Sequence, residues 1–93
     1  MNTTHVPGTR SNRQVFLFAL STCGWCRRTR EFLEANGVEY TYIYVDLLKG
    51  DERKEALDEM RKWTPRQAFP TIIVGEEVLV GLDEDKLRGA LGL

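Results

Sequence analysis

The alternation of hydrophobic and polar residues in the first half of the chain predicts a strand, a helix and a second strand. Residues 15–20 form a continuous apolar run of β-forming side chains, which is typical of a central strand buried on both faces. Residues 24–36 predict a helix, which Gly37 ends in a left-handed conformation. Residues 40–45 then alternate aromatic and β-branched side chains, as strands do.

The second half of the chain predicts a helix, a hairpin and a last helix. Residues 51–63 have an amphipathic pattern, and the residues at helical spacing on its apolar face are Ala56, Leu57, Met60 and Trp63. Two short apolar segments, residues 69–74 and 77–80, flank a Gly-first turn of two residues and therefore predict a hairpin. The last helix begins at about Asp83, where consecutive acidic residues complement the helix dipole.

This order of elements, β-α-β-α-β-β-α, predicts one α/β domain. The first two strands are joined through a helix and should be parallel, whereas the strands of the final hairpin should be antiparallel. We therefore expect a four-stranded mixed sheet covered by three helices over residues 14–93. Residues 1–13 are polar and rich in turn-forming residues, so we expect a flexible N-terminal leader in which His5 is exposed and makes no specific contact.

Length and charge exclude several classes of function. The chain has 93 residues, which is enough for one hydrophobic core but not for two. It has 13 Lys and Arg against 14 Asp and Glu, and this net charge of −1 gives no field that would attract nucleic acid or an anionic membrane. The longest apolar run is far shorter than the ~20 residues of a membrane span, and no secretory signal is visible. We therefore expect a cytoplasmic protein with neither a nucleic-acid nor a membrane partner.

The two cysteines, Cys23 and Cys26, form a C-x-x-C motif at the predicted start of the first helix. A bond between them would close only a small loop, so their role is better explained by chemistry than by stabilisation of the fold. The helix N-terminus and the nearby Arg27 and Arg28 favour the thiolate, the reactive form, of Cys23. Cys26 lies one turn later on the core-facing side and should be the more shielded thiol. Such a pair can exchange disulfides in two steps, in which Cys23 attacks an external disulfide and Cys26 then displaces the product.

Other roles of these residues remain open at this point. The motif is half of a four-ligand zinc site, and a metal ion or iron–sulfur cluster bridged between two chains would complete the ligand set. Within one chain, the single histidine, His5, lies in the predicted leader. An inert cysteine pair is disfavoured, because a helix start beside arginines is not an apolar environment. Trp25 either shapes a substrate surface or packs, and Arg27 and Arg28 either contact substrate or are solvated helix charges.

From residue 14 to residue 93 the sequence resembles the glutaredoxins and glutaredoxin-like redoxins of the thioredoxin superfamily. The resemblance depends on three segments in this order and spacing, namely Cys23-Gly24-Trp25-Cys26, Phe69-Pro70-Thr71 and Val80-Gly81-Leu82-Asp83-Glu84. It implies a thioredoxin-like, glutaredoxin-type fold. It also implies a dithiol–disulfide oxidoreductase that reduces protein disulfides or glutathione mixed disulfides.

The resemblance assigns the chemistry to the cysteine pair and to one proline. Cys23 matches the attacking cysteine of the family, and Cys26 matches the resolving one. Pro70 matches the cis-proline beside the active site. The backbone of Phe69, which precedes it, would pair with bound glutathione or a target peptide as an added strand.

The resemblance also implies a glutathione site. Leu82 and Asp83 match the turn that receives the γ-glutamyl carboxylate of glutathione through N–H groups at a helix start. Trp25 and Arg27 are the other candidate substrate contacts. Glutathione would act as a co-substrate, and we expect no bound cofactor and no metal.

The chain departs from the family pattern at several positions. Gly24 and Trp25 stand where many glutaredoxins have Pro and Tyr, and Val80 replaces the first residue of a glycine pair. Ser21 and Thr22 stand where a basic residue is common. A second expectation is therefore a redoxin that takes electrons from thioredoxin reductase and supplies an enzyme such as ribonucleotide reductase. In either case we expect a monomer that acts on disulfide-containing protein substrates.

Overall fold

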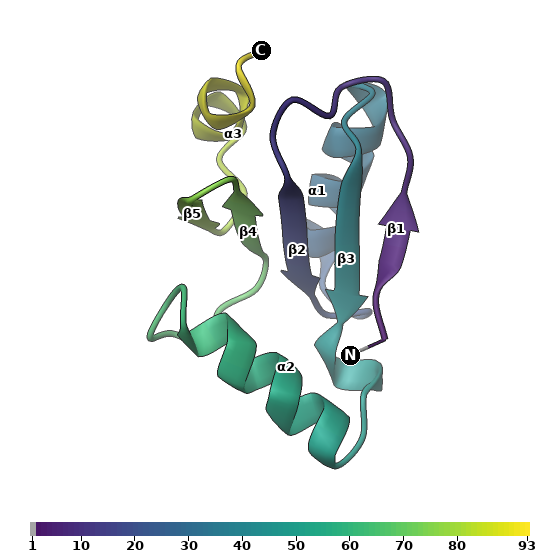
Figure 1. Cartoon of the computed structure of the whole chain (residues 1–93), viewed down its shortest axis with the longest axis vertical. Coiled ribbons are helices and arrows are strands. Elements are labelled where there is room, and N and C mark those ends of the chain that lie inside the picture. The colour runs from purple at the N-terminus through teal and green to yellow at the C-terminus, as the bar shows by residue number, and fades with distance from the viewer. Residues whose placement is uncertain (1) are drawn as a thin grey trace.

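The computed structural model describes residues 2–93 of the chain. This part of the chain forms five strands, three α-helices and one short 3-10 helix (Figure 1). In chain order they are β1 (Thr4–Val6), β2 (Val15–Ala19), α1 (Gly24–Ala35), β3 (Tyr40–Tyr44), the 3-10 helix η1 (Val45–Leu47), α2 (Asp51–Arg61), β4 (Thr71–Val74), β5 (Glu77–Val80) and α3 (Glu84–Leu91). The predicted α/β class and the order of the main elements are confirmed.

The strands form one mixed sheet in the order β1-β3-β2-β4-β5. Strands β2 and β3 are parallel, with Leu17 opposite Tyr42, whereas β4 is antiparallel to β2, with Phe18 opposite Thr71. Strands β4 and β5 form the predicted antiparallel hairpin. This register brings the C-terminal end of β2 and the start of β4 to the same edge of the sheet, where the C-x-x-C motif begins.

The prediction of a four-stranded sheet is wrong, because β1 adds a fifth strand. Thr4–Val6 pairs antiparallel with β3, and the N–H of Arg10 donates to the carbonyl oxygen of Gly37 at 2.9 Å. His5, expected to make no specific contact, places Nδ1 3.0 Å from Oγ1 of Thr41. An edge strand held by backbone hydrogen bonds needs no hydrophobic alternation, and β1 is mostly exposed, so the residue pattern did not reveal it.

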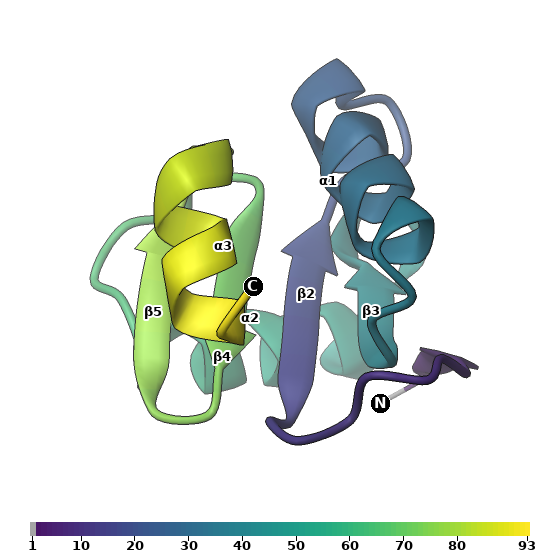
Figure 2. The same ribbon diagram turned by 90° about the horizontal axis from the view of Figure 1, so that it is seen from above.

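The helices divide between the two faces of the sheet, with α1 and α3 on one face and α2 on the other (Figure 2). Successive residues of each strand point to opposite faces, so neighbouring residues such as Leu17 and Phe18 enter different cores. The larger core, under α1 and α3, contains Val15, Leu17, Ala19, Cys26, Phe32, Leu33, Val38, Tyr40, Ile72, Val74, Leu87, Ala90 and Leu91. The smaller core, under α2, contains Phe18, Ile43, Val45, Leu48, Ala56, Met60 and Ile73.

The helix ends differ slightly from the predicted ones. Helix α1 ends at Ala35, and Gly37 follows with the expected positive φ of 67°. Helix α2 ends at Arg61, so Trp63, which was expected on its buried face, lies after the helix and is 38% exposed. Within residues 2–93, no helix combines the length and the apolar character that are needed to cross a membrane.

Candidate active site

Cys23 lies where β2 gives way to α1. A turn, closed by the N–H of Cys23 on the carbonyl oxygen of Leu20 at 3.2 Å, gives Cys23 the extended conformation of an N-cap residue. Its Sγ then accepts the N–H of Cys26 at 3.2 Å, as a helix-capping side chain does. The side chain is half-buried and opens into a small cleft of about 100 Å³ that is also lined by Ser21, Thr22 and Arg27. Cys23 therefore combines access from outside with a position at the positive end of a helix.

Cys26 lies one helical turn later and belongs to the larger core. It has no exposed surface, and both cysteines are free thiols. Burial in the core, followed by the hydrogen bond to Cys23, raises the pKa of Cys26 to about 12. The predicted asymmetry of the pair is thus present in the geometry, because Cys26 is shielded and keeps its proton while Cys23 is accessible.

Three exposed side chains of α1 surround the cysteine pair. Arg27 lines the cleft beside Cys23. Trp25 is 57% exposed, and the guanidinium of Arg28 lies 5.0 Å from the centre of its indole ring. Trp25 and Arg28 therefore form a cation–π pair on the surface, whereas Arg27 places a positive charge at the cleft that Cys23 also lines.

The Phe69–Pro70 peptide bond is cis, as the family resemblance implies. Pro70 is buried immediately before β4, and Phe69 is half-buried and packs against both cores. Because Phe18 lies opposite Thr71, Pro70 is level with the C-terminal end of β2, from which the chain turns toward Cys23. The sequence prediction that these two segments lie at one end of the sheet is confirmed.

The turn before α3 reaches the same region. The N–H of Gly81 donates to the carbonyl oxygen of Pro70 at 2.8 Å, which attaches this turn to the cis-proline segment. Leu82 is half-buried and packs against the larger core, as Cys23 does. Asp83 is exposed and caps α3, accepting the N–H of Lys86 at 3.2 Å. The structure therefore brings all three predicted segments to one region, although the Asp83 carboxylate already uses one N–H group of that helix start.

Asp46 contacts Ser21 beside the motif, a contact that we did not predict from the residue pattern. Asp46 follows β3, and its carboxylate accepts the N–H of Ser21 at 2.8 Å and also the Ser21 hydroxyl. From α2, Arg53 donates to the Asp46 carbonyl oxygen at 2.9 Å. Burial acts to raise the pKa of Asp46, but the hydrogen bonds from Ser21 outweigh it and hold that pKa below its ordinary value. The available signal was an acidic residue directly after a strand parallel to β2, since such strands end at the same edge.

No group of three or more His, Cys, Asp and Glu side chains in residues 2–93 is arranged to hold a metal ion. A metal ion or cluster held by the cysteine pair would therefore need ligands from outside this part of the chain. The geometry supports chemistry on sulfur directly, with an accessible cysteine, a buried neighbour and a cationic side chain at the cleft.

The chain is similar to known proteins in sequence and in fold. The glutaredoxin family model matches residues 15–79. The structure of a glutaredoxin from Methanosarcina mazei Go1 superimposes with a TM-score of 0.85 and 41% identity, covering 98% of this chain and 88% of that one. Methanoredoxin from Methanosarcina acetivorans gives a TM-score of 0.81 and 37% identity, covering 86% of this chain and 85% of that one. A glutaredoxin-like 8.6 kDa protein in the rubredoxin operon of Clostridium pasteurianum is 27% identical over 71 residues, which are 76% of this chain and 88% of that protein.

Proposed function

Because the chain belongs to the glutaredoxin family, we propose that it is a dithiol–disulfide oxidoreductase that reduces protein disulfides or glutathione mixed disulfides. The observation that carries this proposal is the unequal burial of two neighbouring cysteine thiols that are connected by a hydrogen bond. The Sγ of Cys23 is accessible and accepts the N–H of Cys26, whose own thiol is fully buried. An accessible sulfur meets the substrate, and a buried sulfur completes the exchange within the protein.

In the first step, the Cys23 thiolate attacks one sulfur of the substrate disulfide. A bond forms between Cys23 and that sulfur, the substrate disulfide breaks, and the other substrate sulfur leaves as a thiolate that takes a proton from solvent. The N–H of Cys26 and the nearby Arg27 stabilise the attacking anion. The product of this step is a mixed disulfide between Cys23 and the substrate.

In the second step, Cys26 attacks Sγ of Cys23. The Cys23–Cys26 disulfide forms, the bond to the substrate breaks, and the proton of Cys26 passes to the departing substrate sulfur. Burial raises the pKa of Cys26 first of all, but hydrogen bonding to Cys23 and the charge of Cys23 add to the rise. The mixed disulfide neutralises Cys23, so the first step itself makes Cys26 easier to deprotonate. Two electrons have then moved from the cysteine pair to the substrate.

The family resemblance supplies the proposed substrate contacts, and among them Arg27 lines the cleft beside Cys23. We assign the backbone of Phe69 to an extended peptide or glutathione, and the backbone N–H groups of Leu82 and Asp83 to the γ-glutamyl carboxylate. Arg27 and Trp25 would contact the remainder of the substrate. Glutathione enters as a co-substrate rather than as a resident cofactor, and the protein would act as a cytoplasmic monomer.

Turnover by single-cysteine variants tests the proposal. With a protein disulfide as substrate, Cys23→Ser should lose all measurable activity, because no accessible nucleophile remains. Cys26→Ser should lose activity on protein disulfides and trap the mixed disulfide, which mass spectrometry of the intact adduct would show. Full activity in Cys23→Ser would end the assignment of Cys23, and retained activity in Cys26→Ser would indicate a one-cysteine glutathione route.

The reductant is tested with the oxidised protein and NADPH. One arm supplies thioredoxin reductase, and the other supplies glutathione with glutathione reductase. Faster NADPH consumption with glutathione supports the glutathione assignment at Leu82 and Asp83, whereas reduction by thioredoxin reductase alone would place the chain among redoxins that supply an enzyme such as ribonucleotide reductase. The purified protein is also analysed for metal and sulfide. Tightly bound stoichiometric metal would contradict the proposed disulfide exchange with either reductant.

A further inference from the structure

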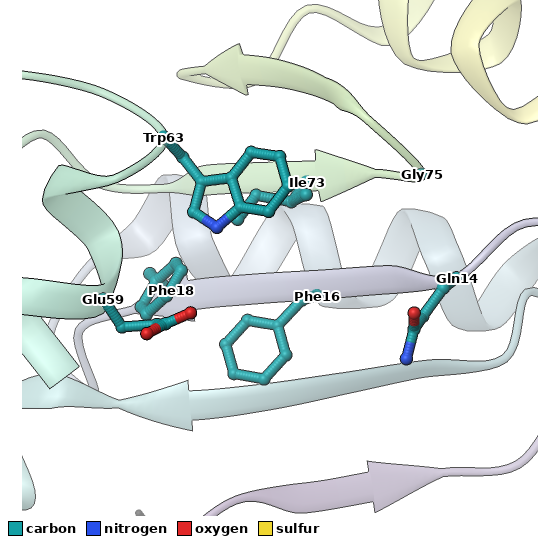
Figure 3. A pocket seen from close by; sticks show the side chains of 7 residues that line it. All are labelled: Gln14, Phe16, Phe18, Glu59, Trp63, Ile73 and Gly75. Atoms are coloured by element: carbon teal, nitrogen blue, oxygen red, sulfur yellow. The ribbon is translucent and has the colours of Figure 1, made fainter.

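A pocket lies on the α2 face of the sheet, away from α1 and the cysteines. Its volume is about 270 Å³, and Figure 3 shows the residues that line it, Gln14, Phe16, Phe18, Glu59, Trp63, Ile73 and Gly75. Helices α1 and α3 cover the opposite face, so this pocket is separate from the redox site (Figure 2). The proposed thiol chemistry uses none of these residues.

Three aromatic side chains line the pocket. Phe16 and Phe18 project from β2 with their ring centres 4.8 Å apart and their planes tilted by 52°. Trp63, from the segment after α2, lies over Ile73 on the other side (Figure 3). Phe18 and Ile73 are buried and form the floor, whereas Phe16 is half-buried and Trp63 is exposed. The negative faces of such rings attract organic cations.

A carboxylate stands at one end of this aromatic wall. Figure 3 shows Glu59 extending from α2 toward the phenylalanine rings, while Gln14 lies at the other end. Oε2 of Glu59 already accepts a hydrogen bond from an ammonium group, because Nζ of Lys62 lies 2.9 Å away. The Lys62 side chain is 69% exposed, and surface pairs of this kind are weak, so another cation can displace it.

We propose that this pocket binds a compact organic cation, an alkylammonium group, through the rings of Trp63 and Phe16 and the carboxylate of Glu59. Aromatic faces beside a carboxylate complement a positive, partly apolar head group better than they complement an anion or a neutral sugar. The volume suits a small free amine or the end of one lysine side chain. These two sources share the chemistry, and the test separates them.

The test uses NMR of the two indole N–H groups, which belong to Trp25 and Trp63. The Trp25→Phe variant assigns them. Choline is titrated against 3,3-dimethyl-1-butanol, a neutral molecule of the same shape, and Nα-acetyl-lysine amide represents the side-chain source. We expect choline to shift the Trp63 signal with millimolar affinity and the neutral molecule to bind at least five-fold more weakly. The stronger of the two cations identifies the source.

Two variants of α2 show whether the charge matters. Glu59→Gln should weaken choline binding about ten-fold, whereas Asp58→Asn, a neighbouring carboxylate outside the pocket, should leave it unchanged. Thermal unfolding of both variants establishes that they are folded. Equal binding of choline and its neutral counterpart, equal affinity of the two variants, or no shift with either cation would overturn the proposal. None of these readouts depends on disulfide exchange, so the redox function can stand or fall separately.

Discussion

The two faces of the sheet receive similar side chains from the same strands but are covered to different extents. On one face, α1 and α3 bury the larger core, and Leu17, Leu33 and Cys26 have no exposed surface. On the other face, α2 alone covers the smaller core, and large apolar side chains such as Phe16 and Trp63 remain partly exposed around a pocket. Burial in this protein therefore depends on helix coverage more than on the hydrophobicity of the individual residue.

This difference separates two kinds of site. The face covered by α1 and α3, the closed face, buries the thiol of Cys26 and raises its pKa, so that the thiol stays protonated. Such a buried thiol suits the role of a resolving cysteine. The face covered by α2, the open face, leaves aromatic rings partly exposed around the pocket, and such rings suit reversible contact with a ligand. Asp46 connects the segment before α1 with α2 on the other face. Its carboxylate accepts the N–H of Ser21, and its carbonyl oxygen accepts a hydrogen bond from Arg53 of α2.

The largest expected effect is on cysteine reactivity. In a Cys23→Ser background, iodoacetamide should alkylate Cys26 at pH 8 at least 100-fold more slowly than it alkylates a cysteine placed on the open face by Phe16→Cys in a protein without the native pair. Cys26 is buried, and burial, the largest cause of its raised pKa, persists when Cys23 is replaced, so little thiolate forms at that pH. Mass spectrometry of timed samples gives both rates. Rates within ten-fold of each other would show that the closed face does not shield its thiol.

Neighbouring residues of β2 provide the second comparison. Leu17→Ala should lower the free energy of unfolding by about 3 kcal/mol, because it opens a cavity in the closed core. Phe16→Ala removes a larger side chain but should cost less, about 2 kcal/mol, since that ring is only partly buried and lines the pocket. Urea unfolding measures both, with Leu17→Val as the milder replacement if Leu17→Ala does not fold. An equal or greater loss in Phe16→Ala would contradict the comparison.

The loss of a charged side chain should also lower the free energy of unfolding more on the closed face than on the open face. On the closed face, Arg30 donates to the hydroxyls of Tyr40 and Tyr44 at 3.0 and 2.7 Å, and its guanidinium lies 4.0 Å from the ring centre of Tyr42. Arg30→Ala leaves these hydroxyls without their donor and should cost about 2 kcal/mol of unfolding free energy. The matched change on α2, Lys62→Ala, should cost less than about 0.5 kcal/mol. Comparable losses in urea unfolding would mean that the Arg30 contacts are no stronger than an exposed pair.

The smallest effect concerns the contact that joins the faces. Asp46→Asn should lower the free energy of unfolding by about 1 kcal/mol at pH 7, because both Ser21 donors lose a charged acceptor and the Asn side chain offers an acceptor oxygen to only one of them. The pKa of Asp46 is held below its ordinary value, so this stabilisation exists above the unfolded pKa of about 3.9 and disappears as the pH falls through the lower folded value. Urea unfolding from pH 7 to pH 2 measures the difference between wild type and variant. A difference that grows toward low pH would have the wrong sign, and Asp58→Asn provides the control.

Much of the fold and the reactive pair could be predicted from residue order. The apolar run of β2, the helical spacing of α1 and α2 and the glycine turn of the final hairpin are local patterns, and each one constrains only its own segment. The C-x-x-C motif at Cys23 and Cys26 is visible in the sequence itself, whereas the cis-proline at position 70 was expected from the family resemblance. A local pattern involves only residues that are close in sequence, so the strands and helices that depend on such patterns could be predicted without the tertiary structure.

Other features depended on contacts between distant parts of the chain. Strand β1 is held at an edge by backbone hydrogen bonds, which any sequence can make, and Asp46 and Ser21 are 25 residues apart. The helical spacing of Trp63 predicted burial, yet α2 ends before it, and within residues 2–93 no second α-helix covers that face (Figure 2). The sequence by itself determined which segments become the main strands and helices and where the cysteine pair lies. Only the tertiary structure decided which surfaces are covered, because coverage depends on where whole helices pack.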